Sequence, residues 1–169
     1  MRTEPIRTAL PHTTRLCLHL IAWLSLASVG VALVSQHVFE MPPCAWCTFQ
    51  RLLYLCLTLI CWLGLLIGRL HSLFGRIACA LSALVAFGGV ATAWYQHDVA
   101  ANMVSCSQTF ADRFMVSSGL DAGVPWLFGI YASCMDARVE LFGVEYALWS
   151  LGLFVFLALL ALVGLRARR

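Results

Sequence analysis

Four long stretches of this sequence contain no charged residue, and they constrain the fold more than any other feature. They are 24, 17, 21 and 20 residues long and cover residues 16–39, 52–68, 77–97 and 146–165. A helix needs about 20 mainly apolar residues to cross the hydrocarbon core of a membrane, where its backbone must bond to itself. Three runs meet this length directly, and residues 48–50 can extend the second. The sequence therefore predicts an all-α membrane protein, a bundle of four transmembrane helices.

Composition excludes the other broad classes of protein. The chain of 169 residues is 62% hydrophobic and 11% charged, whereas soluble domains are about half apolar and about a quarter charged. Such high hydrophobicity also excludes a disordered chain. We expect one membrane domain over residues 1–169. Its spans are expected at about residues 16–36, 48–68, 77–96 and 146–165.

The distribution of arginine predicts the orientation of this domain. All eleven basic residues are Arg, and eight of them, with one acid, lie before the first span, between the second and third, and after the fourth. The opposite side has three Arg and seven acids. The positive-inside rule then places both termini in the cytoplasm and two loops, about residues 37–47 and 97–145, outside. The basic residues lie between apolar runs rather than on one folded face, so we expect no nucleic-acid partner.

The first apolar run has an alternative interpretation, since a basic start followed by apolar residues is also typical of a signal peptide. The uncharged run is too long for one, however, and no clear small-residue cleavage site precedes Pro42. We therefore expect the first span to be retained.

The eight cysteines divide into two groups by location. Cysteine inside an apolar helix behaves as a small hydrophobe, and this is the expected role of Cys17, Cys56, Cys61 and Cys79. The other four lie in the predicted outer loops, where an oxidising compartment permits disulfides. They are Cys44 and Cys47 in the first loop and Cys106 and Cys134 in the second.

Cys44 and Cys47 form a Cys-x-x-Cys motif directly after Pro42-Pro43 and before the second span. Proline fixes helix starts, and the amides and dipole at a helix N-terminus favour a thiolate. Residues 44, 47 and 51 follow the i, i+3, i+7 spacing of one helical face. Arg51 then lies at the membrane edge, where it can stabilise a thiolate and bond an acceptor oxygen. The alternative is that Arg51 is a snorkelling interfacial anchor.

The four outer cysteines have other interpretations. A tetrathiolate zinc site usually uses two close-spaced pairs, and Cys106 and Cys134 are 28 positions apart, so we expect no metal. A c-type haem needs His after the second Cys of the motif, where Thr48 stands. Two inert structural disulfides remain possible in principle, although CxxC pairs are more often redox-active.

Two further features of the outer side are less specific. His97 ends the third span at the membrane level of Cys47 and Arg51. It is either an ordinary interfacial residue or a donor to a ligand bound at that level. The apolar segment 124–131 is too short to cross a membrane, so it either lies on the membrane surface or packs as a plug within the second loop.

Taken together, these motifs resemble the DsbB family of bacterial disulfide bond formation proteins. The resemblance covers about residues 15–165 and rests on Pro43-Cys44-Ala-Trp-Cys47-Thr-Phe-Gln-Arg51, on Tyr95-Gln-His97, and on Cys106 and Cys134. It implies a quinone-dependent thiol:disulfide oxidoreductase of the bacterial cell inner membrane, with its active site on the periplasmic side. The protein would reoxidise a DsbA-like periplasmic dithiol oxidase of thioredoxin fold and pass two electrons to ubiquinone or menaquinone.

The resemblance also implies the order in which the cysteines act. Cys106 would be attacked by the partner's thiolate, and Cys134 would be its disulfide partner at rest. Cys44 would exchange with Cys134 in an interloop intermediate. Cys47 would then be freed as a thiolate that faces the quinone ring in charge-transfer contact.

The quinone site itself would be formed by residues that match the family's positions. Arg51 matches the family's quinone-site arginine, and His97 matches a histidine near the same site. The sequence departs from the family in the bulky Ala45-Trp46 pair inside the motif and in Gln50, where some members carry Glu. These departures affect the tuning of the redox potential rather than the reaction.

Two rival functions remain open at this stage. A vitamin K epoxide reductase-like protein also combines a four-helix core, CxxC and quinone, but there CxxC follows the loop pair along the chain, whereas here it precedes it. A non-enzymatic scaffold would use its disulfides only to brace the outer loops, and its thiol labelling would ignore quinone. A transporter is disfavoured, because no acid or base lies deep inside any span.

Overall fold

The computed structural model describes residues 10–100, 109–133 and 135–167, so Cys106 and Cys134 lie outside the described residues. Each of the four longest helices is long and apolar enough to cross a membrane. They are α1 (His12–His37), α2 (Ala45–Ile67), α3 (Ser72–Asp98) and α7 (Tyr146–Arg166). This confirms the predicted all-α fold with four membrane-spanning helices.

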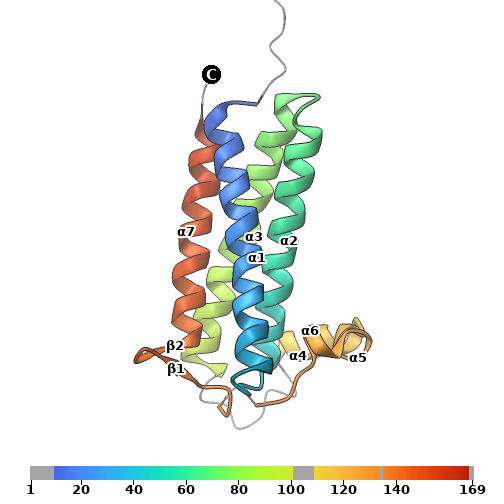
Figure 1. Cartoon of the computed structure of the whole chain (residues 1–169), viewed down its shortest axis with the longest axis vertical. Helices are drawn as coiled ribbons and strands as arrows, with labels where there is room; N and C mark the ends of the chain where they lie inside the picture. Colours follow the sequence, from blue (N-terminus) through green and yellow to red (C-terminus); the bar gives the residue numbers. More distant parts are fainter. Residues whose placement is uncertain (1–9, 101–108, 134, 168–169) are drawn as a thin grey trace, which may run out of the picture.

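The four helices stand side by side in one bundle (Figure 1). Their main contacts run from α1 to α2, from α2 to α3, from α3 to α7 and back to α1. The start of α1, the connection between α2 and α3, and the end of α7 lie at one end of the bundle. The start of α2 and all the shorter elements lie at the other end, which we call the CxxC end.

The helices continue past the predicted spans at most of their ends. The first three begin at His12, Ala45 and Ser72, whereas the apolar pattern places these starts near residues 16, 48 and 77. Arg15 and Arg76 are exposed within the added turns. A helix can continue beyond the hydrocarbon core, because its backbone hydrogen bonds are internal and its charged side chains there reach water. The apolar pattern therefore predicts the part of each helix inside the hydrocarbon, and not where the helix begins.

Between α3 and α7 the chain forms short elements that the sequence pattern did not resolve. They are the helices α4 (Phe110–Ser117), α5 (Leu120–Gly123) and α6 (Pro125–Phe128), and the strands β1 (Glu140–Leu141) and β2 (Val144–Glu145). The strands pair antiparallel. Phe142 and Gly143 between them both have positive φ, as two-residue hairpin turns of type I′ require.

The apolar segment around α6 packs on the start of α2. The N–H groups of Tyr131 and Ala132 donate to the carbonyl of Pro43, at 3.0 and 3.3 Å. Phe128 is buried, whereas 57% of Trp126 is exposed. One side of the segment is therefore a packed plug over the start of α2, and the other side remains open to its surroundings.

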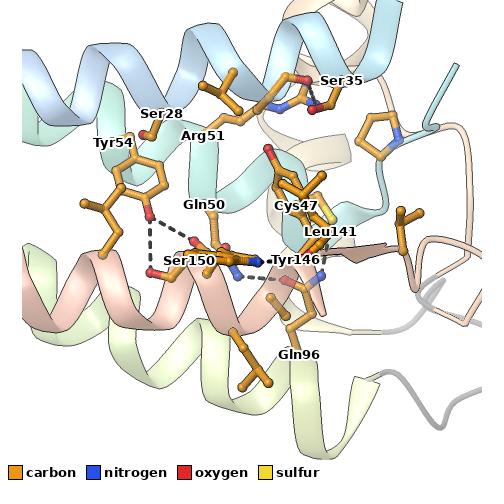
Figure 2. Close-up of a pocket in the computed structure, with 18 of the residues that line it drawn as sticks. Ser28, Ser35, Cys47, Gln50, Arg51, Tyr54, Gln96, Leu141, Tyr146 and Ser150 are labelled. Atoms are coloured by element: carbon orange, nitrogen blue, oxygen red, sulfur yellow. Dashed lines mark hydrogen bonds between the residues drawn. The ribbon is translucent and has the colours of Figure 1, made fainter. Parts of the chain in front are cut away.

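A partly open cavity of about 870 Å³ lies between the helices toward the CxxC end (Figure 2). Side chains of α1, α2 and α7 form most of its wall, and Gln96 of α3 and the segment from Ala137 to Val144 complete it. Ligand pockets have volumes of about 300–1,000 Å³, so this space is large enough for a small organic molecule.

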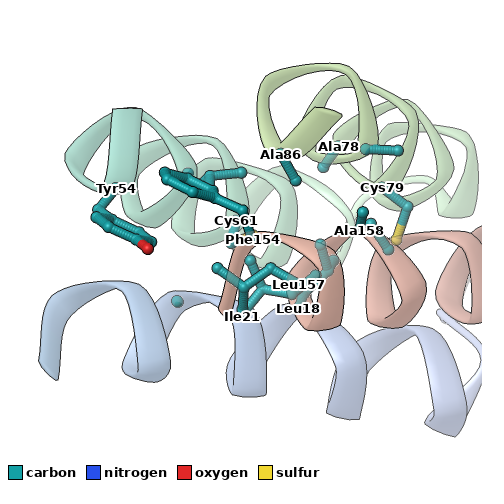
Figure 3. Close-up of a cluster of buried hydrophobic side chains, with 14 of the residues drawn as sticks. Leu18, Ile21, Tyr54, Cys61, Ala78, Cys79, Ala86, Phe154, Leu157 and Ala158 are labelled. Carbon is teal, nitrogen blue, oxygen red and sulfur yellow. The ribbon is translucent and has the colours of Figure 1, made fainter. Parts of the chain in front are cut away.

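The remainder of the bundle is closed by a cluster that combines large apolar side chains with small ones (Figure 3). Along α3 the buried face consists mostly of Gly, Ala, Ser and Cys, which allow helices in a membrane to approach closely. A Cβ atom on Gly89 would lie 2.2 Å from the ring of Phe154. The Phe154 ring in turn stacks on Tyr54, with ring centroids 4.2 Å apart. The floor of the cavity is thus fixed by tight packing.

Candidate redox site at the CxxC end of the bundle

The CxxC motif forms the first turn of α2. Cys44 is the N-cap residue, with extended backbone angles, and its sulfur accepts a hydrogen bond from the N–H of Cys47 at 3.4 Å. The two sulfur atoms are 3.0 Å apart, whereas a disulfide bond is about 2.05 Å long. The two sulfurs therefore lie in contact at the N-terminal end of a helix, the position that the sequence predicts for the motif.

The two sulfurs differ in access. Cys44 is fully buried and packs in a cluster with Trp46, Phe49 and Met115. Cys47 is partly exposed and lines the cavity. A molecule in the cavity can therefore touch Cys47, whereas Cys44 faces the helices at the end of the bundle.

Two glutamine side chains connect this turn to α3. Gln50 Nε2 donates to Gln96 Oε1 at 2.7 Å. Gln96 Nε2 in turn lies 3.2 Å from the sulfur of Cys47 and 3.6 Å from that of Cys44. Both glutamines are buried and both line the cavity (Figure 2).

Arg51 lies one turn further along α2 and also lines the cavity. Only 5% of this residue is exposed. Its guanidinium donates to Gln36 Oε1 at 2.5 Å, to the carbonyl of Leu127 at 2.9 Å and to the carbonyl of Ala32 at 3.3 Å. Arg51 Nε has no hydrogen-bond partner within the described parts of the chain. The side chain is therefore buried and held by three hydrogen bonds at the cavity wall.

The cavity wall combines a mainly apolar surface with a few polar groups, as ligand pockets usually do. Val31, Leu153 and Phe156 represent the apolar part. The hydroxyl groups of Tyr54 and Ser150 hydrogen-bond each other at 2.9 Å on the same wall. The polar groups near the CxxC turn include the thiol of Cys47, the two glutamine amides, the guanidinium of Arg51 and the hydroxyl groups of Ser35 and Tyr146.

An aromatic cluster covers the CxxC turn on the side away from the cavity. Trp46 packs on Tyr95, with ring centroids 4.8 Å apart. Phe49 contacts Phe110 and Phe114 of α4 edge to face, at 5.7 and 5.5 Å. The bulky residue inside the motif thus joins α2 to α3 and, through Phe49, to the short helix α4.

His97 occupies a different position from the other predicted site residues. Its Nδ1 atom donates to Glu145, which also accepts from Arg138 Nε. Burial works to raise the pKa of Glu145, but these two hydrogen bonds outweigh it and lower the pKa of this carboxyl. His97 lines a second cavity of about 20 Å³ and not the large one. The structure thus brings Cys44, Cys47 and Arg51 together and places His97 beside them in an ion-pair network.

The chain that leads to position 134 returns to the CxxC turn. Tyr131 and Ala132 bond to the carbonyl of Pro43, the residue before Cys44. Beyond position 134, Ala137 and Val139 line the large cavity. The second loop is thus bonded through Tyr131 and Ala132 to the residue before the motif of the first loop.

Comparison with known proteins decides the family. The model of the DsbB family, described as disulfide bond formation protein DsbB, matches residues 14–164 of this chain. The chain belongs to the DsbB family. A DsbB-family relative from Herminiimonas arsenicoxydans, disulfide bond formation protein B, is 29% identical over 150 residues, which cover 88% of this chain and 93% of the relative. Disulfide bond formation protein B 2 from Pseudomonas aeruginosa is 32% identical and covers 86% and 87%.

Membership of the DsbB family confirms the resemblance inferred from the motifs. Together with the four apolar helices, it identifies the chain as a multi-pass membrane protein of disulfide bond formation. The CxxC motif at the start of α2 lies at the wall of the large cavity.

Sequence reasoning missed two residues of the candidate site, Gln36 and Gln96. Gln36 appears only as a bond partner of Arg51, and a polar residue near a span end carries no specific signal. Gln96 lies within the Tyr95-Gln-His97 motif, but the sequence analysis assigns a site role only to His97. The available signal was the size and polarity of Gln96, because the buried face of α3 otherwise consists of Gly, Ala, Ser and Cys.

Proposed function

We propose that this protein is a quinone-dependent thiol:disulfide oxidoreductase of the bacterial inner membrane. It reoxidises a DsbA-like periplasmic dithiol oxidase and passes two electrons to ubiquinone or menaquinone. The observation that carries the proposal is the position of Cys47, whose thiol lies in the wall of a mainly apolar cavity of about 870 Å³ beside a buried arginine.

The residues around the cavity fit a quinone. Its apolar wall suits the ring and the isoprenoid chain, and the unpartnered Nε of Arg51 is a buried donor that a carbonyl oxygen can accept from. Arg51 and the glutamine amides would hold the quinone, and Cys47 would contact it. A bound quinone supplies an acceptor for two electrons and two protons. The other groups of the site exclude water and hold Cys47 at the wall.

The electrons reach Cys47 by exchange between sulfur atoms. A thiolate of the partner attacks Cys106, the Cys106–Cys134 bond breaks, and the electron pair leaves on Cys134. The thiolate of Cys134 attacks Cys44, the Cys44–Cys47 bond breaks, and the electron pair leaves on Cys47. The partner's second thiolate then displaces Cys106, which releases the oxidised partner.

The second half of the exchange restores the loop disulfide. Cys106 attacks Cys134 in the Cys44–Cys134 bond, so Cys44 leaves as a thiol beside Cys47. The reduced Cys44–Cys47 pair now holds the two electrons taken from the partner. The hydrogen bonds from Tyr131 and Ala132 to the carbonyl of Pro43 support this exchange, because they hold part of the second loop next to the first.

Two pairs of cysteines are needed because the two substrates differ in location. The partner oxidase is a soluble protein, and a pair in the long second loop is accessible to it. Quinone is a lipid-phase molecule, and Cys47 lies in a cavity among membrane-spanning helices. The distribution of Arg supports an orientation with both termini in the cytoplasm and the CxxC end in the periplasm.

A stoichiometric assay tests the function. The purified protein in detergent is mixed with a reduced DsbA-like oxidase and a soluble ubiquinone analogue, and quinone absorbance is followed. We expect one quinone to be lost for each partner disulfide formed, and no loss with C47S or C106S. If no quinone or partner tried gives any loss while the cysteines remain paired, the protein is a scaffold whose disulfides only brace its loops.

A further inference from the structure

The two buried glutamines beside the CxxC turn form a directed pair. Gln50 is 5% exposed and Gln96 is 8% exposed. An amide buried without a partner costs free energy, so each side chain requires bonds that define its orientation. The donation from Gln50 Nε2 to Gln96 Oε1 at 2.7 Å engages the oxygen of Gln96. The NH₂ group of the same amide is then left facing the other way.

That NH₂ group faces both sulfur atoms of the motif. Gln96 Nε2 is 3.2 Å from the sulfur of Cys47 and 3.6 Å from that of Cys44. Figure 2 shows Gln96 beside Cys47. An amide NH₂ group has two donors, so one side chain can serve both sulfurs. Hydrogen bonds to a charged acceptor are about twice as strong as neutral ones, and a neutral sulfur is a weak acceptor. The contact therefore favours the state in which Cys47 is a thiolate over the disulfide.

We propose that Gln96 is a catalytic hydrogen-bond donor to the Cys47 thiolate, and that Gln50 is a positioning residue that keeps the Gln96 amide turned with its NH₂ group toward the sulfurs. The inference rests on the proposed function and deepens it, because it assigns to this amide pair the tuning of the pair that reduces quinone.

The glutamine pair supplies a neutral hydrogen-bond donor to the sulfurs, which Arg51 does not. Two of the guanidinium nitrogens of Arg51 are already engaged by Gln36, Leu127 and Ala32. The two amides are neutral, so their orientation does not change with pH. They also add no second cation to a mainly apolar cavity. A side chain at position 50 that could only accept hydrogen bonds would favour the flipped Gln96 amide. The oxygen of Gln96 would then face the sulfurs.

The alternative is that the amide pair only joins α2 to α3. The two interpretations differ for a double substitution. Replacing both partners of a buried hydrogen bond by apolar groups of similar shape is often nearly neutral for stability, whereas removing one leaves an unpaired group. If the pair is only a structural link, Q50M/Q96M is milder than either single variant. If Gln96 acts on sulfur, the double variant keeps the full loss of thiolate stabilisation.

The test is a redox equilibrium that needs neither quinone nor the partner oxidase. Full-length protein in detergent is equilibrated at pH 7 in glutathione buffers, trapped by alkylation and analysed by peptide-resolved mass spectrometry. The variants are Q96M, Q50M and Q50M/Q96M. The control is T92V, one turn earlier on α3, whose hydroxyl donates to the carbonyl of Gly89. Thermal unfolding is measured for each variant.

The expected results follow from the two hydrogen bonds in series, from Gln50 to Gln96 and from Gln96 to the sulfurs. Q96M lowers the equilibrium constant for reduction of the Cys44–Cys47 pair about tenfold, which is a shift of about 30 mV. It also lowers the rate of alkylation of reduced Cys47 at pH 7 about tenfold. Q50M has an effect of about threefold, since Gln96 remains but is free to turn. The double variant matches Q96M, because Gln50 acts only through Gln96, and T92V stays within about twofold of wild type.

Three results would overturn the inference. One is a Q96M equilibrium constant within about twofold of wild type. Another is a double variant that recovers the wild-type constant along with its stability. The third is an effect of Q50M that persists when Gln96 is already Met. Failure of the proposed function looks different, because the wild-type protein would then fail to reduce quinone whatever the variants do in glutathione.

Discussion

Two regions of the bundle contain buried cysteines, and the surroundings of these cysteines differ. At the CxxC end, Cys44 and Cys47 lie at a helix N-terminus, in contact with each other and with the amide of Gln96. In the other half of the bundle, Cys17, Cys61 and Cys79 are also buried, the last two within a mainly apolar cluster (Figure 3). The same side chain thus occurs in one molecule at the wall of a cavity and in the packing between helices.

The difference shows that location rather than residue type determines the role of a cysteine here. A Cβ atom on Gly164 would lie 2.9 Å from the sulfur of Cys79, so this thiol fills space between α3 and α7. Cys61 has the hydroxyl of Ser82 at 3.3 Å. Neither lines the large cavity. Helix packing uses these thiols as small hydrophobes, whereas the cavity wall presents Cys47 to a ligand.

The largest expected effect separates the two groups of cysteines directly. C47S lowers quinone reduction by at least about a thousandfold, since serine cannot form the disulfide that carries the electrons. C61A, on the same helix, leaves turnover within about twofold and lowers only the thermal stability. The measurement is steady-state quinone reduction with a saturating partner. Equal loss of activity in both variants would show that the two regions do not differ in role.

Removing the cation of the cavity wall has the next largest effect. R51M loses charge-assisted hydrogen bonds of about 1.5–3 kcal/mol each, so we expect the KM for quinone to rise about 10- to 100-fold. R113M, which removes an exposed arginine from α4, leaves KM unchanged. Quinone titrations at fixed partner concentration measure both. An unchanged KM and turnover in R51M would remove Arg51 from the quinone site and restore the anchor interpretation.

A neighbouring pair of glycines tests the packed half of the bundle. G89A places a Cβ atom 2.2 Å from the ring of Phe154, and overpacking of this kind costs about 1–3 kcal/mol. G88A is the matched control, because nothing lies within 4 Å of its Cβ position. Thermal unfolding in detergent compares them. Equal stability of the two variants would mean that the close contact of α3 with α7 is not what holds the cavity floor.

The smallest expected effect concerns pH and the ion-pair network at His97. Hydrogen bonds from His97 and Arg138 lower the pKa of Glu145 in spite of its burial. A carboxyl with a depressed pKa stabilises the fold above its unfolded value, about 4.3, and this contribution disappears as pH falls through the folded value. E145Q should therefore unfold about 2 °C earlier than wild type at pH 7. The gap should close below about pH 4. A gap that widens in acid would contradict this sign.

Much of the fold follows from sequence because the hydrocarbon core imposes a length and a composition on each span. The four helices, the CxxC turn at the start of α2 and the shared face of Cys47 and Arg51 all have local signals of this kind. The cavity has none, because it arises between residues as distant as Val31 and Phe156. The same holds for the bond from Gln50 to Gln96, which joins positions 46 residues apart.

His97 illustrates a different limit of sequence reasoning. Its position at the end of the third span places it at the level of the site, but helix phase and the hairpin β1–β2 decide what it contacts. The hairpin brings Glu145 to it, and no pattern in the sequence predicts that pairing. Its predicted role at the quinone stays a prediction, which the quinone KM of H97A would test alongside that of R51M.

The most direct test of the central claim uses quinone alone. In the C106S/C134S variant, only Cys44 and Cys47 of the outer cysteines remain. The reduced variant is mixed with one equivalent of a soluble ubiquinone analogue, without any partner. The account predicts one quinol formed for each Cys44–Cys47 disulfide found by mass spectrometry. A reduced pair that stays reduced while quinone is unchanged would contradict it, because Cys47 would then not deliver electrons to the cavity.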